Sequence, residues 1–302
     1  MQYKYSVITI IVVGLSALSN RAYSEESFLR LRSYEPSHIT WRSATGDENA
    51  LRARYSFKYS LLPNDQNNQP THDLFLKYTG EFDFYVSTRP SGPVINRISN
   101  PGIHYQYSYG SQPDLGFGKL KWLGIGVEHL SNGQTTDVSS ASEISKAQAA
   151  YVNGDNQYFD GVSRGVNFIM GEAHSVTEFS SSKLSLYGKA KLYLSQDGDI
   201  TWGPLANKGV RISDYDRIRI LARQSFGKLG DHKYKREASI EWTVGDDFLR
   251  TDSFNIDYME HVSVFGADIP FYVRYHYGPM FTLSNYTQSQ KSLGFGVKFV
   301  PY

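Results

Sequence analysis

The stretch Leu51-Arg52-Ala53-Arg54-Tyr55-Ser56-Phe57-Lys58-Tyr59-Ser60-Leu61 alternates apolar and polar residues along its whole length. Side chains two apart on a β-strand share a face, so one face of this segment is apolar and the other carries arginine, serine and lysine. The run from Lys183 to Leu194 repeats the pattern, with leucines on one face and lysines on the other. Both segments are predicted to form strands that are buried on one face only.

Similar patterning recurs along the rest of the chain and brings the number of well-marked strands to eleven. The further strands are expected at residues 73–88, 102–110, 119–131, 163–174, 216–225, 233–244, 253–260, 270–278 and 291–300. Long connections near 132–162 and 196–215 alternate with shorter ones near 111–118, 175–182 and 226–232. Long external loops, short periplasmic turns and an even strand number are typical of outer-membrane barrels.

The direction of the last strand predicts a twelfth one. If residues 291–300 run down to a periplasmic C-terminus, antiparallel alternation makes residues 51–61 descend as well. An ascending strand must then come earlier, and His38-Ile39-Thr40-Trp41-Arg42 can supply it, with residues 45–49 as its outer loop. The predicted fold is all-β, a transmembrane antiparallel β-barrel of twelve strands.

The N-terminus predicts export. Lys4, an apolar run from Val7 to Leu18 and small residues before Glu25 are the pattern of a cleaved secretory signal, so residues 1–24 are predicted as a signal peptide and 25–302 as the barrel domain. A soluble β-sandwich has the same periodicity. The export signal and an aromatic content of 15%, with 23 tyrosines, favour a barrel in the Gram-negative outer membrane.

The rest of the composition excludes some chemistries. The chain has no cysteine, so neither disulfides nor thiolate metal sites contribute. Its 31 basic and 30 acidic residues offer no argument for a nucleic-acid partner.

One strand carries candidate catalytic residues on its apolar face. His129 and Ser131 continue the row of Leu123, Ile125 and Val127, and an ascending strand places them at the outer end. Asn167 is expected near the top of the following, descending strand. An imidazole can take the proton of a serine hydroxyl, and a third group must hold the imidazole in the right tautomer. By itself the pair is a weak signal that occurs by chance, and a polar strand end with a hydrogen-bonded histidine is the better interpretation of it.

Two short motifs carry a resemblance. The segment His129-Leu130-Ser131-Asn132-Gly133-Gln134, followed by Ser163-Arg164-Gly165-Val166-Asn167, resembles the active-site signature of the outer membrane phospholipase A family. The final hairpin, from Tyr277-Gly278-Pro279 to Gly294-Phe295-Gly296-Val297, is also similar to the end of that family. The resemblance implies a twelve-stranded barrel with Ser131 as nucleophile, His129 as general base, Asn167 as its orienting partner and the Gly133 amide as oxyanion donor.

The resemblance further implies calcium and a homodimer. Members of the family are activated as calcium-bound homodimers, and the ligands map to the Ser163 side chain, the Gln134 carbonyl and, from the partner subunit, Ser91 in a Ser-x-Pro segment. Two features depart from the family. A basic residue is usual where Gln134 stands, and the interval between Ser131 and Asn167 is longer here, filled by the Ser-, Ala- and Asn-rich stretch Thr135–Gly161.

Three functions stay open at this point. The first is a calcium-dependent serine esterase that hydrolyses acyl esters of glycerophospholipids at the outer leaflet, at sn-1 or sn-2. The second is a lipid A deacylase, although deacylases with a His-x-Ser-Asn segment are usually shorter and use glutamate as the third group. The third is a passive pore or adhesin barrel without catalysis.

Overall fold

The computed structural model describes residues 30–44, 48–62, 71–86, 95–196, 200–206, 208–228, 234–265, 267–284 and 286–301. The predicted signal peptide, residues 1–24, and the predicted calcium ligand Ser91 lie outside these ranges. Within the described ranges, no helix is both long and apolar enough to cross a membrane.

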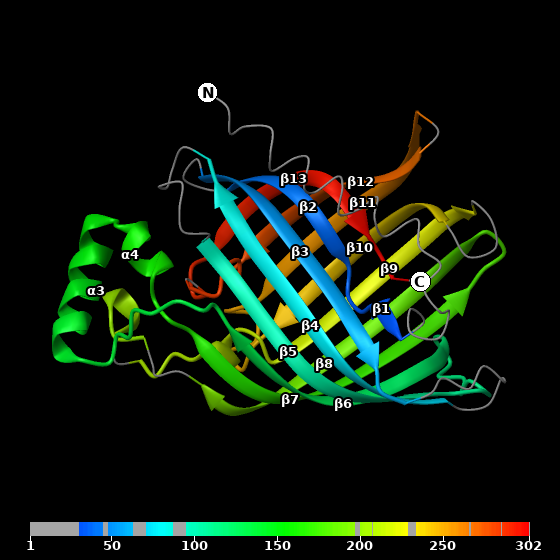
Figure 1. Cartoon of the computed structure of the whole chain (residues 1–302), viewed down its shortest axis with the longest axis horizontal. Coiled ribbons are helices and arrows are strands. Elements are labelled where there is room, and N and C mark those ends of the chain that lie inside the picture. The colour runs from blue at the N-terminus through cyan, green and yellow to red at the C-terminus, as the bar shows by residue number, and fades with distance from the viewer. Residues whose placement is uncertain are drawn as a thin grey trace.

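The described strands form a closed antiparallel barrel (Figure 1). Each strand from β2 to β13 pairs with the next one along the chain, and β13 pairs with β2 to close the ring. The strands are β1 Leu31–Ser33, β2 Ser37–Ala44, β3 Glu48–Ser60, β4 Thr71–Tyr85, β5 Ile95–Ser108, β6 Lys119–Ser131, β7 Gly165–Glu178, β8 Ser182–Gln196, β9 Ile218–Lys228, β10 Tyr234–Val244, β11 Ser253–Val264, β12 Ala267–Gly278 and β13 Gln290–Phe299.

The predicted twelve-stranded barrel is confirmed, including its first strand, which the parity argument required. β2 pairs with β13 through Trp41 and Phe295 and with β3 through Trp41 and Leu51. The short β1 was not predicted. It pairs with the end of β3, as in Leu31 with Tyr59, beyond the residues of β3 that pair with β2.

The barrel is apolar outside and polar inside. On β6 the outward residues Ile125 and Val127 are 56% and 48% exposed, whereas Glu128, directly after Val127, is 4% exposed. Buried carboxylates inside pair with cations: Asp83 with Arg42 and Arg52, Glu128 with Lys77, Asp216 with Lys191 and Arg219, and Asp257 with Arg274 and Lys298. A soluble sandwich would turn its apolar faces inward, so this distribution is that of an outer-membrane barrel.

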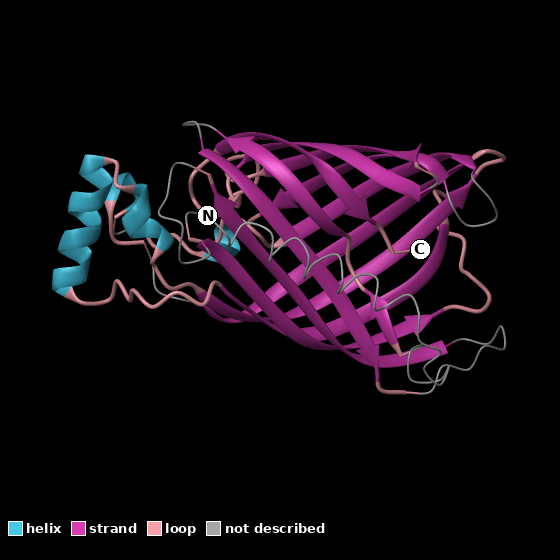
Figure 2. Ribbon diagram, turned by 45° about the horizontal axis from the view of Figure 1, so that its top comes forward, coloured by secondary structure: helices cyan, strands magenta, loops and turns pink. Residues whose placement is uncertain are grey.

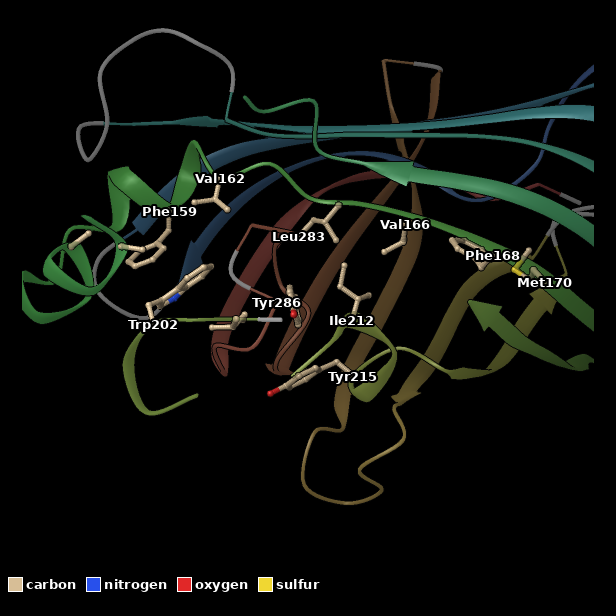
Figure 3. Close-up of a cluster of buried hydrophobic side chains, with 13 residues drawn as sticks. Phe159, Val162, Val166, Phe168, Met170, Trp202, Ile212, Tyr215, Leu283 and Tyr286 are labelled. Carbon is tan, nitrogen blue, oxygen red and sulfur yellow. The ribbon is translucent and has the colours of Figure 1, made fainter. Parts of the chain in front are cut away.

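The long outer connections pack together at one end of the barrel. The stretch after β6 holds α3 (Ala141–Asn153) and α4 (Asn156–Asp160), which stand beyond the barrel end (Figure 2). A buried apolar cluster joins this insert to β7 and to the loops after β8 and β12 (Figure 3). Its members include Phe159, Val162, Val166, Phe168, Trp202, Ile212, Tyr215, Leu283 and Tyr286. The loops after β6, β8 and β12 are therefore one packed cap.

Part of the cap also reaches into the outer half of the lumen. Phe281, in the loop after β12, lies 4.6 Å from the guanidinium carbon of both Arg42 and Arg52, and its carbonyl accepts a hydrogen bond from Arg52. A cavity of about 170 Å³ remains beneath this loop, and a larger one of about 640 Å³ is lined by residues of the periplasmic half, among them Lys58 and Trp122.

Candidate active site

The strand register brings His129 and Asn167 directly opposite each other. β6 ascends and β7 descends beside it, with His129 paired to Asn167 and Ser131 paired to Gly165. The His129 Nδ1 atom lies 2.9 Å from Asn167 Oδ1. Both side chains are exposed on the outer surface of the barrel, in line with Val127. The site therefore lies on the apolar wall, at its outer rim.

The hydrogen bond determines which histidine nitrogen carries the proton. An amide oxygen only accepts, so Nδ1 is the donor and Nε2 keeps its lone pair. Asn167 in turn donates from Nδ2 to Ser195 Oγ, 2.7 Å away on β8, which holds the amide in this orientation. The imidazole is thus held in the tautomer that can act as a base through Nε2.

Ser131 shares the outer face with His129 and is half-buried. Two residues along a strand span about 6.6 Å, a separation that an imidazole can bridge by rotating. Within the described chain, no hydrogen bond joins Nε2 to the Ser131 hydroxyl. Catalytic hydrogen bonds are often long in the unliganded state and shorten when substrate binds.

The turn after Ser131 presents an open hydrogen-bond donor. Gly133 has φ of 59°, a left-handed conformation that favours glycine, and it is exposed. Its N–H makes no hydrogen bond to any residue that the structure describes. Its carbonyl accepts a hydrogen bond of 2.8 Å from Arg97 Nη2 on β5. A backbone N–H beside the serine that makes no other hydrogen bond can donate one to an oxyanion.

Asn132 anchors this turn from inside. Its side chain is fully buried and makes four hydrogen bonds. Nδ2 donates to Val162 O at 2.8 Å and to Ser284 Oγ at 3.2 Å, and Oδ1 accepts from Arg164 N at 2.9 Å and from Gln134 N at 3.3 Å. One side chain therefore ties the turn to the start of β7 and to the loop after β12.

The two segments that carry the predicted calcium ligands Gln134 and Ser163 lie next to each other in the structure. Asn132 Oδ1 binds the backbone amides of both Gln134 and Arg164, so the two predicted ligand segments lie side by side. The Ser163 hydroxyl and the Gln134 carbonyl have no hydrogen-bond partner among the described residues. Both are neutral oxygens of the type calcium accepts, although a full shell of about 6–8 oxygens needs water or a further ligand. Among the residues that the structure describes, no group of three or more His, Cys, Asp or Glu could hold a metal.

Sequence reasoning missed several residues of the site. Asn132 lay inside the quoted motif, and its position between Ser131 and Gly133 was the only signal for it. Arg97, Ser195 and Ser284 lie on other strands and loops, and no local pattern marked them. Strand register and loop packing bring these three residues to the site from distant segments of the chain. The catalytic and metal roles of the predicted residues stay predictions.

No protein-family model matches the chain, and no curated protein sequence matches it. Solved structures do match. The outer membrane phospholipase A dimer of Salmonella typhi with bound calcium superposes with a TM-score of 0.63 at 12% identity, covering 93% of this chain and 95% of that one. Outer membrane phospholipase A from Escherichia coli gives 0.60 at 13% identity, covering 94% and 95%. The chain thus has the fold of the outer membrane phospholipase A barrels.

Proposed function

We propose that this protein is an outer-membrane phospholipase that cleaves acyl esters of glycerophospholipids with Ser131, His129 and Asn167. The observation that carries the proposal is the exposed His129–Asn167 hydrogen bond on the apolar outer wall, with Ser131 on the same face. A pore has no use for a histidine held in the basic tautomer on its lipid side. A lipid with its chains in the bilayer can reach this face without leaving the membrane.

The proposed reaction uses the groups in sequence. Nε2 of His129 removes the proton of Ser131 Oγ as the oxygen attacks the ester carbonyl, and the N–H of Gly133 binds the oxygen on which negative charge develops. The protonated imidazole then gives its proton to the leaving glycerol oxygen, which leaves an acyl-serine. Water, activated by the same imidazole, hydrolyses that ester and releases the fatty acid. An oxyanion donor of this kind often contributes about 2.7–4 kcal/mol.

Calcium and a second copy belong to the same proposal. Ser163 Oγ and the Gln134 carbonyl would hold the ion, with Ser91 contributed by the partner of a homodimer. Calcium bound there would stabilise negative charge beside the turn. With neutral protein ligands its affinity would be modest, so activity would follow the local calcium concentration. Chelation should then abolish turnover and shift the protein toward monomers in sedimentation experiments. Fully active chelated monomers would refute this part.

The decisive experiment measures fatty-acid release from mixed micelles of phosphatidylethanolamine, with and without calcium, for wild type and Ser131→Ala. Loss of release in Ser131→Ala, with the heat-modifiable barrel intact on gels, is the expected result. Ser99→Ala is a matched control, because Ser99 pairs with Ser131 from β5 but belongs to no proposed catalytic step. Full activity in Ser131→Ala would exclude it as the nucleophile.

The two rival functions are tested alongside. Release of fatty acid from lipid A but not from phosphatidylethanolamine would support the deacylase. Conductance in planar bilayers, unchanged by Ser131→Ala and without any lipase activity, would support the pore. Phe281 packs on Arg42 and Arg52 inside the lumen, and a loop that occupies part of the lumen argues against a wide pore.

A further inference from the structure

Arg97 lies beside the catalytic turn, and the proposed reaction does not use its charge. It is exposed on the outer face of β5, next to Asn96, which is 1% exposed and points inward. Two residues farther along β5, Ser99 pairs with Ser131. Arg97 therefore belongs to the same outward surface as the nucleophile, at the outer end of the neighbouring strand.

The guanidinium lies over the turn. Arg97 Nη2 donates to the Gly133 carbonyl at 2.8 Å. A β-carbon added to Gly133 would lie 2.8 Å from Nη2 and 3.2 Å from Nε. Glycine at this position thus leaves the space that the guanidinium occupies. The positive charge is held within a few ångströms of the proposed oxyanion donor.

No carboxylate among the described residues pairs with Arg97. Cations inside the barrel do pair with carboxylates: Lys77 pairs with Glu128, and Arg52 pairs with Asp83. A guanidinium has five N–H groups in a planar fork, and one of them binds the Gly133 carbonyl. The remaining donors suit a phosphate, which such a fork binds through two oxygens.

The direction along the barrel also fits a phospholipid. β5 descends from the outer side, so Arg97 lies outward of Ser99 and of Ser131 by two residues, about 6.6 Å. In a bilayer the phosphate of a glycerophospholipid lies on the water side of its acyl esters, a few bonds away. An ester carbonyl at Ser131 therefore has its phosphate on the side where Arg97 lies.

We infer that Arg97 binds the phosphate of the lipid substrate and so makes the enzyme selective for phospholipids over neutral glycerides. This inference rests on the proposed function and adds the group that recognises the substrate. Arg97 is a specificity-determining residue that touches the substrate away from the reacting atoms. The Gly133 carbonyl keeps the guanidinium in place before the lipid arrives.

The test compares two substrates with the same acyl chains in the same micelles, phosphatidylethanolamine and diacylglycerol. In the full-length protein, Arg97→Gln should lower kcat/KM for phosphatidylethanolamine by about 10- to 100-fold, the range for losing a charge-assisted hydrogen bond. Hydrolysis of diacylglycerol should change by less than about threefold, since it offers no phosphate. Arg97→Lys should be intermediate, because lysine keeps the charge but not the fork.

Arg250→Gln is the control. It removes an exposed arginine from the outer loop between β10 and β11, on the far side of the ring from β5, and should change neither rate. Equal loss on both substrates in Arg97→Gln would show that Arg97 only supports the turn. No loss on either would show that the guanidinium has no role. Each of these results overturns the inference.

A binding measurement separates the inference from the proposed reaction. In the Ser131→Ala background, calorimetry should show that Arg97→Gln weakens binding of dihexanoyl phosphatidylcholine and leaves that of dihexanoylglycerol unchanged. Unaltered binding of the phospholipid would overturn the phosphate site, whatever the turnover experiments give. A wild type that binds the phospholipid through Arg97 and releases no fatty acid would instead refute the proposed function alone.

Discussion

Replacing Asn132 by alanine should disable the active site while leaving the barrel folded. The side chain is fully buried between the proposed nucleophile and the oxyanion turn, and it makes four hydrogen bonds to three separate segments. Alanine cannot replace any of them. The two shorter bonds, to Val162 O and from Arg164 N, are the ones that hold the turn against β7.

The size of the effect follows from those bonds. A neutral hydrogen bond contributes about 1 kcal/mol net, and a buried partner left unpaired costs about 1–3 kcal/mol. Two short bonds and two longer ones give a local loss of about 2–4 kcal/mol, since part of the cost is relieved by water entering near the rim. If the loss falls on transition-state positioning, kcat should drop by about 30- to 1000-fold.

The assay combines turnover with hydrogen exchange. Fatty-acid release measures the catalytic loss, and exchange of the Gln134 and Arg164 amides, both bonded to Asn132 Oδ1, measures opening of the turn. Ser284→Ala is the matched control, because it removes only the 3.2 Å bond and should lower kcat by less than about fivefold. Wild-type turnover in Asn132→Ala, with both amides still protected, would refute the positioning role.

Two further predictions concern neighbouring residues. Asn167→Ala removes the acceptor of His129 Nδ1–H, so kcat should fall by about 10²-fold, the lower part of the range for general acid–base catalysis. Asn167→Asp should retain more activity, because a carboxylate still accepts a hydrogen bond from Nδ1–H. Equal rates in the two variants would argue against an orienting role. Gly133→Ala places a side chain in a left-handed conformation and in contact with Arg97, which should cost about 1–2 kcal/mol and lower phospholipid turnover by about tenfold. If Gly133→Ala lowers diacylglycerol and phospholipid turnover equally, the damage lies in the turn and not in the guanidinium.

Strand parity was the most productive sequence argument. The sequence pattern of residues 38–42 predicts a strand only weakly. The requirement that antiparallel strands alternate in direction predicts that these residues form the first strand. The structure extends that strand to Ser37–Ala44 and pairs it with β13. Alternating strand direction also predicts His129 and Asn167 at the outer ends of adjacent strands, whereas the register that puts them directly opposite each other comes only from the structure.

The connection after Ser131 was less predictable. Thr135–Gly161 is Ser-, Ala- and Asn-rich, and its length indicated a long loop. In the structure it holds two helices, with Ser140 as N-cap of α3 and Gly154 in the left-handed conformation at its C-terminus. Ala147 and Ala150 of α3 are buried in the cap cluster together with Trp202 and Tyr286 from other loops. Those contacts join segments that are far apart in sequence, so no local sequence pattern predicts them.

The sequence alone determined which residues face outward and how many strands close the ring, because side chains alternate along a strand and antiparallel strands alternate in direction. It also determined that His129 and Ser131 share the apolar face. Tertiary structure alone decided what surrounds them. Arg97, Asn132 and Ser195 meet the site through strand register and loop packing. These depend on contacts between segments that are 28 or more residues apart in sequence, as the bonds from Asn167 to Ser195, from Asn132 to Val162 and from Arg97 to Gly133 illustrate.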